Sequence, residues 1–328
     1  GSKEALYTQL VDEILVSNFP SFDNCNNLSD ALTEIIKIME EAFYYVPTFS
    51  DHKIEKYKLE LINHIKRKAK RPGYICYHNA FNQLDPTHRF NFNKLGTIKE
   101  AESLSREDLL SFHDKISKYP FSIVYQGEND VNQYERLMKS FPSDFELPIY
   151  QDIPFKLCDP IYGEEDFDTE STVIEVLYHF DMKYSLDNLN VMHILDNMIG
   201  GYNGILFNEI REKRGLCYSI NSIICVSENI IEISTSVNKD KVEETLKSIE
   251  EIMTHFEDYF LTEDMERSRM DCLSRLIERT DGPNDIFEHN IVTLYKRNFI
   301  DKFDEQVASL YAVKKDDILK QKKLTISS

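Results

Sequence analysis

An arginine and a tyrosine in the second half of the chain have the types and the spacing to do chemistry. Arg211 precedes Tyr218 by seven positions, with Gly215 between them. A guanidinium and a phenol both donate hydrogen bonds, and two such donors can hold a substrate carbonyl or stabilise an oxyanion. The pair therefore predicts donor chemistry directed at a bound ligand.

Glycine-bounded elements must position these two side chains. The run 200–204 reads Gly-Gly-Tyr-Asn-Gly, which favours a tight turn. An amphipathic helix that carries Arg211 is expected next, and it should end at Gly215, because glycine commonly terminates helices. A hairpin of 218–227 and 229–237 should follow, so that the guanidinium and the phenol face one cleft.

The pattern Arg-x-x-x-x-x-x-Tyr, after a Gly-rich turn and before a long hairpin, resembles the second half of the pitrilysin family of zinc proteases. That family includes insulinase and mitochondrial processing peptidase. The resemblance implies that Arg211 and Tyr218 hydrogen-bond the substrate backbone and help to hold the tetrahedral intermediate. It also implies substrate contacts at Gly201, Asn203 and Phe207.

A plainer interpretation of the same residues stays open. Arg211 could only pair with Glu209 or Glu212 on a solvated helix, and Tyr218 could be a core residue.

A zinc motif is the next thing to look for, because active members of this family carry His-x-x-Glu-His on a helix of the first half. None of the nine histidines begins that motif. The nearest match, His52-Lys53-Ile54-Glu55-Lys56, has lysine in place of the second ligand, and an ammonium group cannot bind zinc. His193 is expected to be a core or surface residue. We therefore expect no metal in this chain and zinc in a partner subunit.

An internal repeat is indicated by apolar stripes and polar pairs that recur at offsets of 209 to 212 residues. A stripe over 32–43 and a helix capped by Ser50 up to about Lys68 match a stripe over 242–256 and a helix capped by Thr262 up to about Arg279. The pairs 78–79 and 107–108 likewise match 289–290 and 316–317. At this offset the counterpart of the Arg211 helix falls before residue 1.

The repeat predicts an α+β fold of two units, each an antiparallel sheet with helices packed on one face. The first unit, 1–150, is expected to be truncated at its N-terminus and to lack a zinc motif; the second, 168–328, carries the Arg/Tyr pair. A proline-rich linker with Pro148, Pro154 and Pro160 separates them. Further expected elements are strands over 121–127 and 171–180 and helices over 132–141 and 187–199.

The composition of the chain limits the classes of molecule that it can bind. The formal net charge of −19 over 328 residues argues against nucleic acid and permits a basic peptide. We expect no membrane insertion and no signal peptide, since no apolar run has the required length. Six cysteines without metal-binding spacing indicate a reducing cytoplasm, with Cys217 a core thiol rather than a nucleophile.

The resemblance implies a non-catalytic, substrate-binding subunit of a heterodimeric zinc endopeptidase, inactive alone and active with a partner that carries His-x-x-Glu-His. The leader of a bacteriocin-like modified peptide is one substrate that it suggests. Two alternatives remain: a structural or peptide-binding scaffold subunit, and a fragment of a complete zinc protease whose zinc motif lies upstream.

Overall fold

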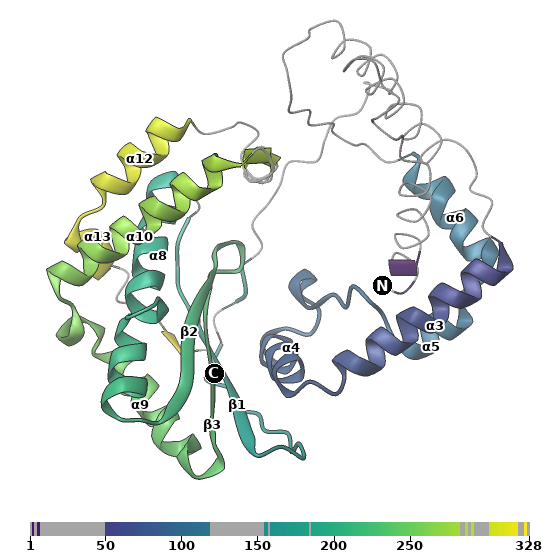
Figure 1. Cartoon of the computed structure of the whole chain (residues 1–328), viewed down its shortest axis with the longest axis horizontal. Coiled ribbons are helices and arrows are strands. Elements are labelled where there is room, and N and C mark those ends of the chain that lie inside the picture. Colours follow the sequence, from purple (N-terminus) through teal and green to yellow (C-terminus); the bar gives the residue numbers. More distant parts are fainter. Residues whose placement is uncertain are drawn as a thin grey trace, which may run out of the picture. The chain divides into compact units, whose positions relative to one another are not determined.

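The computed structural model describes residues 2, 5–6, 50–118, 154–156, 158–183, 185–282, 286–287, 290–291, 302–320 and 325–326. The chain forms two compact units (Figure 1). One unit combines Gly1–Lys70 with Phe92–Pro148, and the other combines Arg71–Asn91 with Ile149–Ser328. Each unit is described by itself.

The described part of the first unit is helical, with α3 (Asp51–Lys68), α5 (Ile98–Ser103) and α6 (Arg106–Ile116). The side chain of Ser50 accepts a hydrogen bond from the backbone N–H of Lys53, which confirms the predicted cap. Apolar side chains of these helices share a core that includes Ile54, Leu61 and Leu109. The predicted stripe 32–43, strand 121–127 and helix 132–141 lie outside the described residues.

An antiparallel sheet forms the centre of the second unit, which confirms the α+β class. Its strands are β1 (Ser171–His179), β2 (Cys217–Cys225), β3 (Ile230–Asn238) and β4 (Thr325–Ile326), in the order β2-β3-β1-β4. β1 pairs with β3 from Ser171 opposite Asn238 to His179 opposite Ile230. β4 pairs only with Tyr178 and His179, so no described strand borders β1 between Ser171 and Leu177 on the side away from β3.

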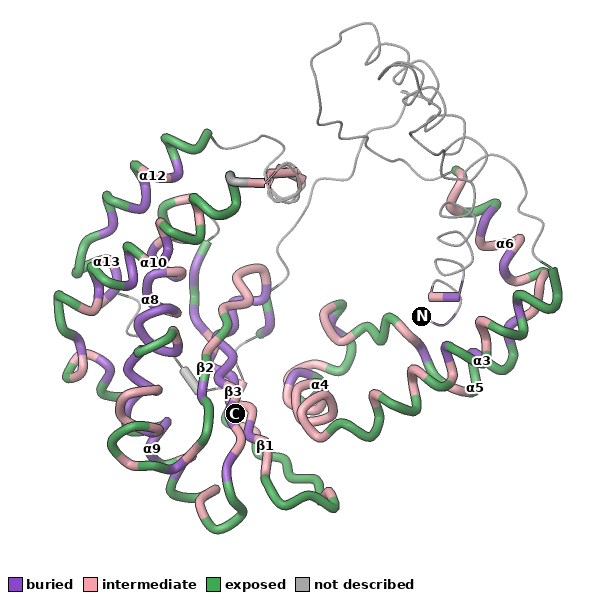
Figure 2. Tube along the Cα trace, viewed as in Figure 1, coloured by how far each residue is buried: buried purple, intermediate pink, exposed green. Residues whose placement is uncertain are grey.

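One face of this sheet packs on α8 (Leu186–Gly200) and α9 (Val242–Thr254), and α10 (Thr262–Asp281) packs on α8 (Figure 1). Ile174, Val176 and Tyr178, which alternate along β1, join the main core with side chains of α8. Buried residues accordingly lie along α8 and the strands in Figure 2. Helices α12 (Phe303–Ala312) and α13 (Lys315–Leu319) also contact α8.

The predicted cap of α10 was wrong. Thr262 is the first helical residue, and Leu261 occupies the N-cap without a side-chain hydrogen bond. Glu263 and Asp264 in the first turn stabilise this end instead, through the positive end of the helix dipole.

Helix α4 (Pro72–Leu84) belongs to the second unit although it precedes most of it in sequence. Phe81 of α4 packs with Phe155, Leu177 and Ile230 in a separate small core. Leu177 alternates with the residues of β1 that face α8, so α4 lies on the opposite face of the sheet. The sequence pattern did not predict this second covered face. Short 3-10 helices lie at Arg89–Asn91, Val226–Glu228, Lys239–Lys241 and Phe256–Tyr259.

Candidate functional site

The Gly-rich turn begins where α8 meets β2. A Cβ atom at Gly200 would lie 2.1 Å from the backbone nitrogen of Ser222, so only glycine allows this close approach of helix and strand. The backbone N–H of Gly201 donates to the carbonyl of Asn197 at 3.0 Å and ends the helix. A Cβ atom at Gly201 would lie 2.4 Å from the carbonyl oxygen of Asn197, so Gly201 has a structural role in this conformation.

Asn203 sits at the tip of the turn with φ of 62°, a left-handed conformation that asparagine tolerates. Its carbonyl accepts hydrogen bonds from Asn208 Nδ2 at 2.8 Å and from Arg267 Nη2 at 3.3 Å. Arg267 also pairs with Asp264, at 2.6 Å. Helix α10 thus holds the turn, a contact that sequence reasoning missed because 64 residues separate the two partners.

The segment that carries Arg211 is helical as predicted, and it is a π-helix, η3 (Phe207–Lys213). Its wider turn is closed by the backbone N–H of Leu216, which donates to Ile210 at 3.1 Å. Gly215 follows with φ of 62°, where glycine is favoured. Short π-helical segments are rare and occur frequently at functional sites.

Arg211 lies against an aromatic pair. Its guanidinium is 4.6 Å from the centre of the Phe207 ring, and the Phe207 and Tyr202 rings are 5.7 Å apart. Arg211 Nη1 also donates to Glu212 Oε1 at 2.7 Å, with side chains 39% and 55% exposed. An ion pair this exposed contributes about 0–1 kcal/mol, so a ligand can displace Glu212. Glu209 pairs with Lys213 instead.

Tyr218 lies in an irregular step of the β2–β3 ladder. Cys217 pairs with Val237 and Ser219 with Ser236, so Tyr218 is the extra residue of a β-bulge. Bulges redirect side chains and are common beside active sites. Tyr218 is 81% exposed, so it is not a core residue.

The start of β2 lies near the guanidinium of Arg211. Burial raises the pKa of the half-buried Cys217 thiol, and the neighbouring Thr235 and Arg211 oppose that rise only partly. Cys217 therefore stays protonated, as expected of a structural thiol. Arg211 and Tyr202 each contact Phe207, whereas no hydrogen bond joins Arg211 to Tyr218 in the described part of the chain.

The residues of the described ranges do not fit a zinc ion. No group of three or more histidine, cysteine, aspartate or glutamate side chains lies together there. On α8, the half-buried His193 accepts a hydrogen bond from the Cys272 thiol through its backbone carbonyl. Burial raises the pKa of Asp196, whose carboxyl accepts a hydrogen bond from the Ser222 hydroxyl. The absence of metal from this chain stays a prediction.

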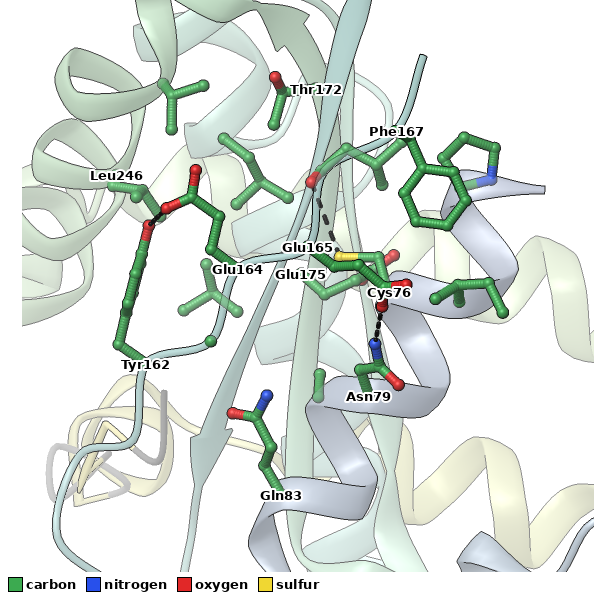
Figure 3. Close-up of a pocket in the computed structure, with 18 of the residues that line it drawn as sticks. Cys76, Asn79, Gln83, Tyr162, Glu164, Glu165, Phe167, Thr172, Glu175 and Leu246 are labelled. Atoms are coloured by element: carbon green, nitrogen blue, oxygen red, sulfur yellow. Dashed lines mark hydrogen bonds between the residues drawn. The ribbon is translucent and has the colours of Figure 1, made fainter. Parts of the chain in front are cut away.

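A cavity of about 670 Å³ lies elsewhere in the second unit, between α4, the segment 161–169 and β1 (Figure 3). None of the predicted site residues lines it. Sequence reasoning missed this cavity, because its walls come from three distant parts of the chain.

Glu175 lines the inner wall of this cavity, and Glu232 lies next to it without lining the cavity. Glu175 Oε1 accepts from Ser234 at 2.8 Å, while the buried Oε2 has no N–H or hydroxyl donor among the described residues. Glu232, from β3, is only 6% exposed. Burial, together with the charge of Glu232, raises the pKa of Glu175 to about 8; burial likewise raises the pKa of Glu232. The Glu175 carboxyl therefore keeps a proton near neutral pH.

The described helices include none that is long and apolar enough to span a membrane.

Comparison with known proteins shows one family. The sequence profile described as the Peptidase M16 inactive domain matches residues 103–271. A curated relative from Rickettsia bellii (strain RML369-C), named "Uncharacterized zinc protease", is 24% identical over 269 residues, which cover 77% of this chain and 61% of that protein. The chain therefore spans less than two thirds of that relative.

Two solved structures share the fold. A conserved protein from Enterococcus faecalis V583 superimposes with a TM-score of 0.81 and 14% identity, covering 99% of this chain and 88% of that one. A peptidase M16 inactive domain from Pseudomonas fluorescens gives a TM-score of 0.71 and 14% identity, covering 91% and 73%.

Proposed function

We propose that this chain, which belongs to the peptidase M16 family and matches its inactive domain, binds peptide substrates for a zinc-bearing peptidase partner. In this proposal the chain has no peptidase activity alone. The zinc motif His-x-x-Glu-His belongs to the partner, which is a second subunit or another stretch of a longer polypeptide.

The observation that supports the proposal best is the irregular backbone beneath both donors. A π-helix carries Arg211, and a β-bulge carries Tyr218, which is 81% exposed. Irregular backbone costs stability and is retained where a side chain must take an unusual direction. The two donors are therefore suited to a ligand that approaches from outside the unit.

Each donor has a distinct part in the proposal. The guanidinium of Arg211, stacked on Phe207, donates to a peptide carbonyl after it leaves Glu212. The hydroxyl of Tyr218 donates to the same peptide or to the oxyanion that forms on it. The turn around Asn203, held by Arg267, fixes the start of the π-helix.

The test is cleavage of a peptide by the chain reconstituted with its zinc-bearing partner. Arg211→Ala and Tyr218→Phe should each slow cleavage by about 10²–10³, the usual effect of losing one oxyanion donor. Lys213→Ala, on the same π-helix, and Tyr311→Phe, on α12, are matched controls, since both side chains are exposed and lie outside the proposed site. Unchanged cleavage by the Arg211 and Tyr218 variants would contradict the assignment.

A second candidate is a scaffold subunit without a part in proteolysis, and the ion pair between Arg211 and Glu212 favours it. If the chain is a scaffold, substitutions on its surface should reduce the amount of complex that forms. The cleavage rate of each complex that does form should stay the same. Size-exclusion chromatography beside the cleavage assay separates the two candidates.

The substrate and the compartment stay parts of the proposal. The leader of a bacteriocin-like modified peptide is the substrate to assay first. The five described cysteines are free thiols, which supports a reducing cytoplasm. Mass spectrometry of peptides cleaved by the reconstituted pair, and cell fractionation, test these two points.

A further inference from the structure

The cavity beside β1 has an excess of carboxylates in its walls. Glu164, Glu165 and Asp166 line it from the segment before β1, and Glu175 lines it from β1 itself. Lys239 is the only lysine or arginine among its lining residues. Carboxylates gathered around a concave, partly apolar surface concentrate negative potential inside it.

Hydrogen bonds orient two of these carboxylates at the mouth of the cavity. Asn79 Nδ2 of α4 donates to Glu165 Oε2 at 2.8 Å, and the Tyr162 hydroxyl lies 3.3 Å from Glu164 Oε2. Figure 3 shows Tyr162 and Glu164 on one side and Glu165 with Asn79 on the other. The two carboxylates therefore flank the opening, and each keeps a second oxygen available for a ligand.

The inner wall adds a hydrogen-bond acceptor that the described residues leave unused. Glu175 lines the cavity, and its buried Oε2 has no N–H or hydroxyl donor among the described residues. Such an acceptor is available to an N–H group of a ligand. A positively charged group in the cavity would be attracted by the carboxylates at the mouth and would meet this acceptor at the inner wall.

The remaining walls suit the stem of a long side chain. Ile75 of α4 and Val242 and Leu246 of α9 line the cavity beside the carboxylates. Lysine and arginine place their methylene groups on apolar surface while the charged end meets polar atoms. The exposed ring of Tyr162, at the mouth, can also attract a cation through its face.

We propose that this cavity holds the ammonium or guanidinium group of a basic side chain from a peptide that the chain binds. The cavity thereby selects peptides with lysine or arginine at one position. This inference rests on the proposed function, because it assumes that the chain handles peptides. The ligand sits apart from Arg211 and Tyr218, which do not line the cavity.

Calorimetric titration of the full chain tests the proposal, with acetyl-Ala-Ala-Arg-Ala-Ala-amide as the probe. The same peptide with norleucine in place of arginine keeps the stem and removes the charge, and it should bind at least tenfold more weakly. Agmatine, a free guanidinium compound, should bind at least tenfold more weakly than the arginine peptide as well. Equal binding of norleucine peptide or agmatine would overturn the proposal.

Two double variants separate the cavity from the overall negative charge. Glu164→Gln with Glu165→Gln removes the two carboxylates at the mouth and should weaken binding of the arginine peptide at least tenfold. Asp168→Asn with Glu170→Gln makes the same change in net charge on the same segment, outside the cavity, and should change binding less than twofold. An equal loss in both double variants, or no binding to the unaltered chain at millimolar peptide, would overturn the proposal.

The outcome does not depend on the zinc-bearing partner. The titration uses the chain alone, whereas cleavage needs the reconstituted pair. Glu164→Gln with Glu165→Gln therefore tests the cavity, and Arg211→Ala or Tyr218→Phe tests the proposed function. Thermal melting followed by circular dichroism confirms that each variant is folded.

Discussion

Glu175 makes the stability of the second unit depend on pH in a direction that can be worked out. The pKa of its carboxyl rises from an ordinary 4.5 to about 8 in the folded chain, mainly through burial and further through Glu232. Between these two values the native state holds a proton that the unfolded chain has lost. The free energy of unfolding must therefore fall as pH rises through this window.

The charged neighbours of Glu175 do not reverse this sign. From α4, Cys76 and Tyr77 both have pKa values raised by burial, so they stay neutral throughout the window. From β3, Glu232 brings a like charge, and Ser234 brings only a hydroxyl. Lys239 is the one cation among the residues that line the cavity, and it does not counteract the rise in the pKa of Glu175.

Glu175→Gln removes the extra proton and keeps the shape, since an amide oxygen can still accept from Ser234. One proton difference corresponds to a slope of about 1.4 kcal/mol per pH unit at its steepest. Relative to the unaltered chain, the variant should thus become more stable as pH rises from about 5.5 to 7.5. A plot of its free energy of unfolding against pH should fall less steeply over that interval, by up to about 1.4 kcal/mol per pH unit.

The measurement is urea unfolding followed by circular dichroism at five pH values, together with hydrogen exchange of β1. Glu170→Gln, one residue before β1 and exposed, is the matched control and should leave the slope unchanged. Parallel pH profiles for Glu175→Gln and the unaltered chain would refute the reasoning, because the proton on Glu175 would then have no energetic effect.

Three further outcomes are expected. Gly200→Ala should lower the free energy of unfolding by about 1–3 kcal/mol, because the added Cβ meets the Ser222 backbone. Gly73→Ala should leave it unchanged, because the space around Gly73 is open. Thermal melting compares the two variants. Arg267→Ala should increase hydrogen exchange in 201–208 and lower cleavage by the reconstituted pair, since the carbonyl of Asn203 loses a donor; unchanged exchange would contradict this role. Burial raises the pKa of the Cys76 thiol from 9.0 to about 11. At pH 8 this thiol should therefore react with iodoacetamide roughly a hundredfold more slowly in the folded chain than in urea. Mass spectrometry can measure the two rates, and equal rates would contradict the raised pKa.

Local patterns predicted most of the second unit. The run 171–180 is rich in β-branched and aromatic residues, and the structure has β1 at Ser171–His179. The hairpin and the helix over 187–199 were also predicted within one or two residues of their observed bounds. These elements depend on short-range periodicity, which a single sequence displays directly.

Features that depend on distant partners were not predicted. The bulge at Tyr218 exists only in the register with β3, and a π-helix differs from an α-helix by a hydrogen-bond shift that leaves no periodic signature. Glu175 looks like an ordinary polar residue of a strand until Glu232 is placed beside it. The family resemblance pointed to Arg211 and Tyr218, but it gave no indication of the cavity.

The position of α4 affects how this chain can be divided. A fragment that starts at Ile149 follows the boundary near the linker, yet it lacks the helix that covers Leu177 and Ile230. Such a fragment would expose an apolar patch beside the stretch of β1 that no described strand borders, a combination that promotes strand-to-strand aggregation. Supplying residues 71–91 in trans as a separate peptide should restore its solubility, because the helix would then return as a complementing segment.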